Sequence, residues 1–205
     1  MTLTLPPLYP ITPDALRGPA LTAWAGDILD AGCRLLQYRR KSGPDRERLR
    51  DLEDLMALCR TYGCKVIVDD RVDLVMLSGA DGVHLGQDDL PPSEARQLLG
   101  PGKLIGFSTH SLEQFEEGLE APADYLALGP VFPTTGKDDP SPVVSPALQE
   151  QALRISPLPV VAIGGVTPHN APALWTRGFA SVAVIGALSV RPGEAWREFM
   201  AAAGR

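Results

Sequence analysis

The chain has 205 residues, of which 44% are hydrophobic, and this suits one globular domain with a substantial core. Its net charge of −6 and pI near 5.1 argue against a nucleic-acid-binding surface, which would need a cluster of basic side chains. No apolar run approaches the roughly 20 residues of a membrane span, and the N-terminus lacks the pattern of a signal peptide.

Eight short apolar runs predict β-strands. They are continuous rather than alternating apolar and polar, as is typical of strands buried on both faces of a parallel sheet. In chain order they cover residues 8–11, 34–39, 65–69, 82–85, 103–108, 125–129, 159–164 and 181–186.

Segments with an apolar stripe at helical spacing lie between the predicted strands. Residues 46–60 carry such a stripe, formed by Leu49, Leu52, Met56 and Cys59. The last segment, 193–205, keeps three large apolar residues on one side: Trp196, Phe199 and Met200. Both segments are therefore predicted to be helices that pack one face on the sheet.

Cap residues place several helix ends. Ser145 and Thr167 each precede a proline, which predicts a helix start at both positions. Gly178 is expected to end the helix that begins at Thr167, and Gly32 the first helix.

The three cysteines are Cys33, Cys59 and Cys64, and their spacing is not that of a metal site. We therefore expect reduced and mostly buried thiols in a cytoplasmic protein.

Eight strand–helix units in residues 1–205 predict a single (β/α)8 TIM barrel. The alternative is an open doubly wound sheet, but no G-x-G-x-x-G motif follows the first strand. The Pro/Gly-rich stretch 129–144 falls after the sixth strand, where a long loop is usually functional.

Polar residues and glycines concentrate just after the predicted strands, and active sites of barrels lie at this end. In chain order they are Gln37, Arg39, Arg40, Lys41, Asp69, Asp70, His84, Asp88, Asp89, Ser108, Thr109, His110, Thr134, Thr135, Lys137, Gly164, Gly165 and Gly186.

The mixture of charges predicts a diphosphate site. Arg39, Lys41 and Lys137 are cations, and the acids after the third and fourth strands suit Mg²⁺, whose remaining positions take water and phosphate oxygens. The pair Gly164–Gly165 predicts a second anion site, because glycines let backbone N–H groups approach a ligand near the usual phosphate position of barrels.

Each motif also has a structural alternative. The stretch QYRRK (37–41) by itself is more typical of a solvated strand end, and Asp69–Asp70 is equally typical of a surface ion pair with the next arginine. His84 alone indicates a core histidine, His110 a cap or loop residue, and the paired glycines a tight turn. Only their common position at successive strand ends favours function.

The sequence resembles the thiamin phosphate synthase family of small (β/α)8 barrels, over nearly the whole chain from LYPIT to VAVIGAL. The resemblance is densest in QYRRK, DDRVDL, GADGVHLGQDDLP, GFSTHS, GPVFPT-x-x-K and VVAIGGVTP. It implies an enzyme that couples hydroxymethylpyrimidine diphosphate to a thiazole phosphate and releases diphosphate.

The resemblance also implies residue roles. Gln37 would contact the pyrimidine, Arg39 and Lys41 would hold the diphosphate, and Asp70 and Asp89 would bind Mg²⁺. Ser108 and Lys137 would meet the leaving diphosphate, and these two with Arg39 and Lys41 are the expected catalytic residues. The thiazole phosphate would lie at Gly164–Gly165 and at Ile185–Gly186. The remaining expected substrate-binding residues are Asp69, His84 and Thr134.

Three positions depart from the usual family pattern. Asp69 stands where the family has asparagine, Gly136 where it has threonine, and Gly186 where it has serine. Because residues adjacent on a strand face opposite sides, we expect Asp70 and Asp89 to share Mg²⁺ while Asp69 and Asp88 point elsewhere.

Two alternatives stay open. The related thiazole tautomerases share the barrel but need no Mg²⁺, and His110 matches their candidate proton-transfer residue after the fifth strand. The other is a barrel that binds a phosphorylated metabolite without catalysis. Small-molecule substrates are the expected partners, with no nucleic acid or membrane, and a homodimer stays open.

Overall fold

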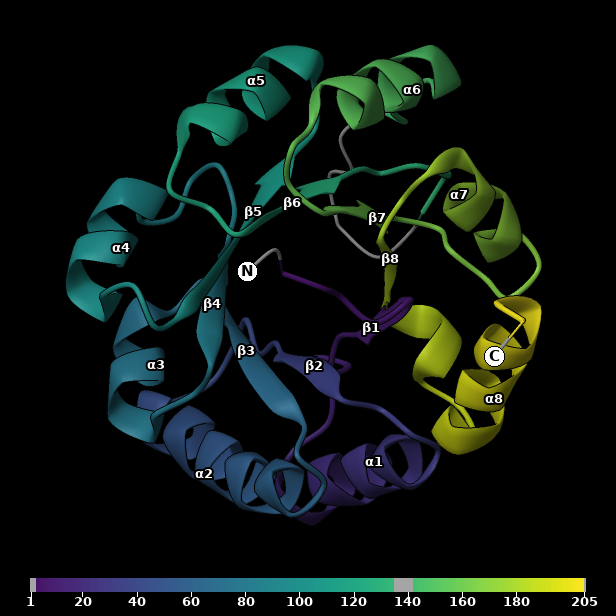
Figure 1. Ribbon diagram of the computed structural model, residues 1–205. Helices are drawn as coiled ribbons and strands as arrows, with labels where there is room; N and C mark the ends of the chain where they lie inside the picture. The colour runs from purple at the N-terminus through teal and green to yellow at the C-terminus, as the bar shows by residue number, and fades with distance from the viewer. Residues whose placement is uncertain (1–2, 135–141, 205) are drawn as a thin grey trace.

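A computed structural model describes residues 3–134 and 142–204 and shows a (β/α)8 barrel, as predicted (Figure 1). A ring of helices surrounds a central cylinder of parallel strands. The strands are β1 Leu8–Pro10, β2 Leu35–Tyr38, β3 Lys65–Asp69, β4 Gly82–Leu85, β5 Leu104–Thr109, β6 Tyr125–Leu128, β7 Val160–Ile163 and β8 Ser181–Val184. The helices are α1 Gly18–Asp30, α2 Asp45–Thr61, α3 Val72–Ser78, α4 Pro92–Leu99, α5 Leu112–Glu120, α6 Pro146–Ile155, α7 Ala171–Arg177 and α8 Pro192–Ala202, with a 3₁₀ turn η1 at Gly186–Leu188.

The strands pair in parallel in the order β1-β8-β7-β6-β5-β4-β3-β2. A bridge between Ile11 and Gln37, with the Thr12 N–H donating to the Gln37 carbonyl at 2.9 Å, joins β1 to β2. The sheet therefore closes on itself, which excludes the open doubly wound alternative.

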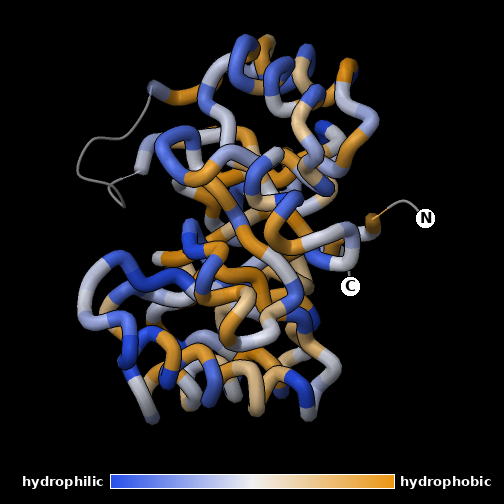
Figure 2. Tube along the Cα trace, turned by 90° about the vertical axis from the view of Figure 1, so that its left-hand side faces the viewer, coloured by the Kyte–Doolittle hydropathy of each residue, from blue (hydrophilic) through white to orange (hydrophobic). Residues whose placement is uncertain are grey.

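Alternation along each strand separates two apolar cores. Leu8, Leu36 and Val66 face outward and pack with the helices in the larger core. Tyr9 and Ile67 face inward and belong to a smaller core that fills the barrel. In Figure 2 the helices change repeatedly from blue to orange along the trace, as expected of elements with one buried face.

The predicted helix ends are confirmed at three of four positions. The Ser145 side chain accepts the Leu148 N–H at the start of α6, Gly178 ends α7 with a left-handed backbone, and Gly32 follows the end of α1 with φ 110°. The prediction for Thr167 was wrong, because α7 begins only at Ala171. Thr167 and Asn170 instead close a separate turn, in which Asn170 Oδ1 accepts the Thr167 N–H at 2.8 Å.

The three cysteines are buried and free, as expected. Within residues 3–134 and 142–204, no helix is long and apolar enough to cross a membrane.

Candidate active site

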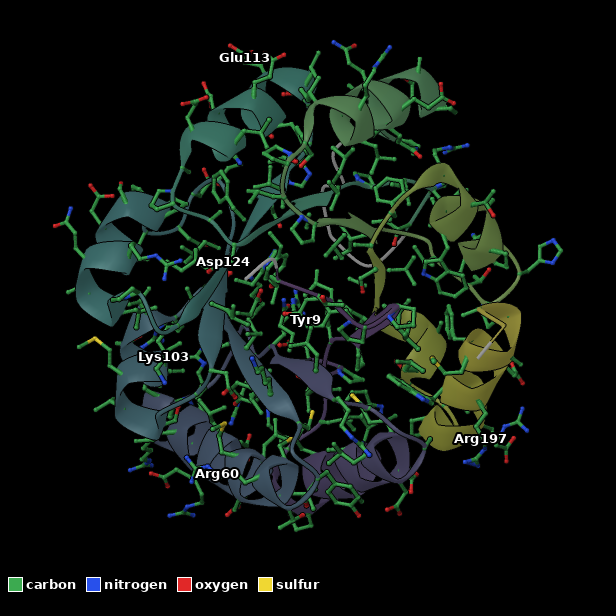
Figure 3. All side chains as sticks on the ribbon, in the orientation of Figure 1. Tyr9, Arg60, Lys103, Glu113, Asp124 and Arg197 are labelled. Carbon is green, nitrogen blue, oxygen red and sulfur yellow. The ribbon has the colours of Figure 1, made fainter. Side chains whose placement is uncertain are left out.

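A cavity of about 660 Å³ opens at the carboxyl ends of the strands. This volume lies within the usual range for small-molecule sites. Most of the predicted site residues line it: Gln37, Arg39, Lys41, Asp69, Asp70, His84, Asp88, Asp89, Ser108, His110 and Ile185. Tyr9, labelled at the centre of the ring in Figure 3, lies in the wall as well. The fold therefore brings together predicted site residues from the ends of five strands, β2, β3, β4, β5 and β8.

The two cations of the site come from the end of β2 and the loop that follows. Several contacts fix this loop, since Asp14 Oδ1 accepts the Lys41 N–H at 2.6 Å and Arg48 donates to the Lys41 carbonyl at 3.0 Å. Arg39 lies close by, with its guanidinium 3.9 Å from the same Asp14 oxygen. Arg40 points away and pairs with Asp51 at 2.8 Å, so it anchors the loop outside the cavity.

Asp69 points into the cavity, so the expectation that it points elsewhere was wrong. Its Oδ2 lies 3.1 Å from Lys41 Nζ and 3.6 Å from Arg39 Nε, and it takes no hydrogen bond from a described residue. Burial raises the pKa of Asp69 to about 6, with Asp70 adding to the increase and the two cations opposing it. The Asp69 carboxylate thus lies near both cations of the cavity.

Asp70 reaches the same cavity because its backbone reverses direction. Its φ is 62°, a left-handed conformation that aspartate adopts more readily than most residues, and its N–H donates to the His84 carbonyl at 2.8 Å. This turn brings the Asp70 carboxylate to Lys41 Nζ and beside Asp89. The carboxylates of Asp69, the last residue of β3, and of Asp70, the residue after it, therefore face the same cavity.

Asp89 completes a pair of acids at the cavity wall. Its Oδ2 accepts the Gly86 N–H at 2.7 Å, which fixes the carboxylate against the β4–α4 loop. Burial raises the pKa of Asp89, and the neighbouring Asp70 raises it further. A divalent cation between the two would remove this repulsion. No cluster of three or more acids, histidines or cysteines with metal-site geometry occurs among the residues that the structure describes.

The glycine turn after β7 is held by the segment after β6. Gly164 and Gly165 have φ of 99° and 65°, and an added Cβ on Gly165 would lie 2.4 Å from the Pro133 carbonyl oxygen. These glycines are thus required by backbone conformation and close packing, and they do not line the cavity. Gly186 differs, because a side chain there would meet nothing within 4 Å. The serine usual in the family would fit.

Two further residues were predicted to bind substrate, Thr134 and Lys137. Thr134 is half-buried at the end of the described segment and is absent from the cavity wall. Lys137, like Thr135 and Gly136, lies outside the described residues. Their predicted roles stay predictions.

His110 lies at the cavity with a fixed ring. Its Nδ1 is 2.6 Å from the Gly129 carbonyl oxygen. Because a carbonyl only accepts, Nδ1 carries the proton and a neutral ring leaves Nε2 as an acceptor.

Sequence reasoning missed two tyrosines in the barrel interior. Tyr9 and Tyr125 are 1% and 0% exposed, and their hydroxyl groups lie 3.0 Å apart between Gln37 and His84. Each tyrosine lies in an apolar run for which the sequence predicts only a strand. Their alternation with outward-facing aliphatic neighbours could have shown that both side chains point into the barrel.

Comparison with known proteins places this site in a family. The family model described as thiamine monophosphate synthase matches residues 8–188. The chain belongs to the thiamine monophosphate synthase family. Among relatives, a thiamine-phosphate synthase of Parasynechococcus marenigrum is 50% identical over 160 residues, which cover 78% of this chain and 46% of that protein. One from Koribacter versatilis is 39% identical over 203 residues, covering 97% and 96%.

The thiamine monophosphate synthase fold is also shared with a solved structure. Thiamine phosphate pyrophosphorylase from Pyrococcus furiosus is 33% identical with a TM-score of 0.86, over 96% of this chain and 95% of that one. The chain spans about half the length of the first curated relatives, between 46% and 49%. The family is therefore shown, while the activity of the whole protein is a proposal.

Proposed function

We propose that this protein is a thiamine-phosphate synthase, which joins hydroxymethylpyrimidine diphosphate to a thiazole phosphate and releases diphosphate. The observation that carries the proposal is the cavity at the strand ends, where Arg39 and Lys41 face Asp70 and Asp89. Relatives named thiamine-phosphate synthase cover most of the chain.

The cations act on the leaving group. When the C–O bond to the diphosphate breaks, negative charge grows on the diphosphate oxygens, and Arg39 and Lys41, which line the cavity, would stabilise it. The thiazole nitrogen then forms the new C–N bond with the pyrimidine methylene carbon. No protein nucleophile is required.

The acids fit a magnesium ion. Asp70 and Asp89 provide two neighbouring carboxylates, and Mg²⁺ typically takes one or two and fills its other positions with water and phosphate oxygens. Bound there, Mg²⁺ would neutralise charge on the leaving diphosphate. Asp69 would instead remain paired with Arg39 and Lys41.

One experiment tests the proposal. The purified protein is incubated with both phosphorylated substrates, with Mg²⁺ or with EDTA, and thiamin phosphate is measured. We expect product only with Mg²⁺. Product formation in EDTA would show that the reaction does not require Mg²⁺. The absence of product under every condition would contradict synthase activity.

A second candidate, thiazole tautomerase activity, is favoured by one observation. His110 lies at the cavity with Nε2 as the acceptor, as a proton-transfer group requires. A tautomerase would isomerise the thiazole carboxylate in EDTA and lose this activity in His110→Ala. A wild type that never isomerises that compound excludes it.

A further inference from the structure

A continuous chain of hydrogen bonds crosses the barrel interior between two residues of the proposed site. Gln37 Nε2 donates to the Tyr9 hydroxyl at 3.3 Å, and this hydroxyl lies 3.0 Å from that of Tyr125. The Tyr125 hydroxyl lies 3.1 Å from His84 Nδ1, and His84 Nε2 lies 2.8 Å from Ser108 Oγ. Both ends of the chain, Gln37 and Ser108, line the cavity.

The surrounding backbone is adapted to this chain. Gly106 on β5 lies between His84 on β4 and Tyr125 on β6 in the strand register. An added Cβ on Gly106 would lie 2.1 Å from Tyr125 Cζ and 2.4 Å from His84 Nδ1. The missing side chain therefore lets the histidine reach the tyrosine across the intervening strand. Their rings stack with centroids 5.6 Å apart.

The chain has a direction, because each hydroxyl group carries one proton. Gln37 Nε2 only donates, so the Tyr9 proton is directed to Tyr125 and the Tyr125 proton to His84 Nδ1. Neutral His84 then holds its proton on Nε2 and donates it to Ser108 Oγ. With Gln37 in this orientation, the reverse direction would make Tyr9 accept twice and keep a buried proton without an acceptor, which costs free energy. Only rotation of the Gln37 amide, which turns Oε1 toward Tyr9, permits the reverse direction.

We propose that Tyr9 and Tyr125 are positioning residues that fix the hydrogen-bonding polarity at both ends of this chain. Gln37 then presents Oε1, an acceptor, to the ligand, and Ser108 presents its hydroxyl proton. The matching ligand is a planar heteroaromatic ring with an N–H donor toward β2 and an acceptor toward β5. Resting on the proposed function, this predicts selection of an amino-substituted pyrimidine diphosphate over its oxo-substituted analogue.

Two variants break the chain at different links. Tyr125→Phe removes the donor to His84 Nδ1, so the ring should lose its single tautomer. Tyr9→Phe leaves that donor in place, so the His84 tautomer should persist. In both variants Gln37 is freed to rotate its amide, and the preference for the amino pyrimidine should fall by about tenfold, the usual value of one hydrogen bond. Binding of thiazole phosphate should not change.

Two measurements on the full chain test the proposal. Heteronuclear NMR of labelled histidine rings reports the tautomer, with His84→Gln assigning the signal, and calorimetry compares the amino and oxo ligands. The matched control is Tyr62→Phe, which removes a tyrosine hydroxyl bonded to Asp30 and outside the chain. The control should keep both the tautomer and the preference.

Three outcomes would overturn the proposal. A wild-type His84 protonated on Nδ1 would reverse the polarity. An unchanged amino preference in both chain variants would remove the positioning role. A wild type that binds neither pyrimidine diphosphate would overturn both the ligand assignment and the proposed function. The direction of the hydrogen bonds is tested separately, by the NMR spectrum of the histidine rings in the ligand-free protein.

Discussion

Two different backbone features place Asp70 and Asp89 side by side at the cavity. Asp70 turns toward the cavity with φ 62°, and Asp89 is held by the Gly86 N–H. Asp70 also contacts Lys41 Nζ, so protein contacts hold each carboxylate in place. A shared Mg²⁺ is the proposed role of this pair.

The first prediction removes each of these acids. Asp70→Ala and Asp89→Ala should each lower the rate of thiamin phosphate formation by orders of magnitude, because each would lose one of two protein ligands to Mg²⁺. The matched control is Asp54→Ala, since Asp54 is an exposed acid on α2 that does not line the cavity. Steady-state rates at saturating Mg²⁺ decide the question, and full activity in either variant would exclude that residue from the metal site.

The second prediction concerns Asp69, which pairs with Arg39 and Lys41. Asp69→Asn removes the anion that lies between Arg39 and Lys41, while Lys41 keeps its contact with Asp70 and Arg39 its contact with Asp14. Binding of the pyrimidine diphosphate should tighten by roughly 1 to 2 kcal/mol, about five- to thirtyfold in affinity.

Calorimetric titration at pH 8 and fixed Mg²⁺ measures this change, with Asp54→Asn, an exposed acid outside the cavity, as the control. Binding of the thiazole phosphate should be the same in all three proteins. Weaker diphosphate binding in Asp69→Asn would show that the aspartate assists binding instead of competing with it.

At the scale of elements, the turn after β7 depends on the segment after β6. Gly164 packs on Pro130 and Gly165 on Pro133, and the Val131 N–H donates to the Ile163 carbonyl at 2.9 Å. The two connections therefore form one packed unit on the rim of the cavity.

The third prediction compares two glycines. Gly165→Ala should destabilise the protein by about 2 to 4 kcal/mol, because the residue has φ 65° and its new Cβ would meet the Pro133 oxygen at 2.4 Å. Thermal unfolding should show a Tm lower by roughly 5 to 15 °C. Gly186→Ala is the matched control and should leave Tm nearly unchanged, since its site is open. Equal Tm values for the two variants would contradict the packing described here.

At the scale of the whole molecule, the two ends of the barrel interior differ. Leu5, Leu35 and Leu104 belong to the interior core toward the start of the strands. Arg39, Lys41 and the acids lie at the other end, where the cavity opens. The apolar packing of these leucines and the charged side chains of the cavity therefore lie at opposite ends of the barrel axis.

The fourth prediction uses this separation. Mg²⁺ alone should change Tm little, because only two carboxylates hold it, whereas Mg²⁺ with inorganic diphosphate should raise Tm by roughly 5 to 10 °C at a hundredfold excess over Kd. Lys41→Ala should reduce this increase. Scanning calorimetry measures it, and the same increase with diphosphate in EDTA would contradict a metal-bridged site.

The sequence by itself determined the barrel and most of the cavity. Buried parallel strands need continuous apolar runs, so all eight strands were found, with β3 and β4 at their observed bounds. Since parallel strands all end at one rim, Gln37, Arg39 and Ser108 could be assigned to one cavity from chain order alone.

Only the tertiary structure decided where particular side chains point. Strand alternation alone predicted that Asp69 would point away from Asp70, whereas the left-handed backbone of Asp70 brings both carboxylates to the same lysine. The hydrogen bonds from Gln37 to Ser108 join residues up to 116 positions apart. Such contacts are set by the stagger of a closed barrel, which no local pattern encodes.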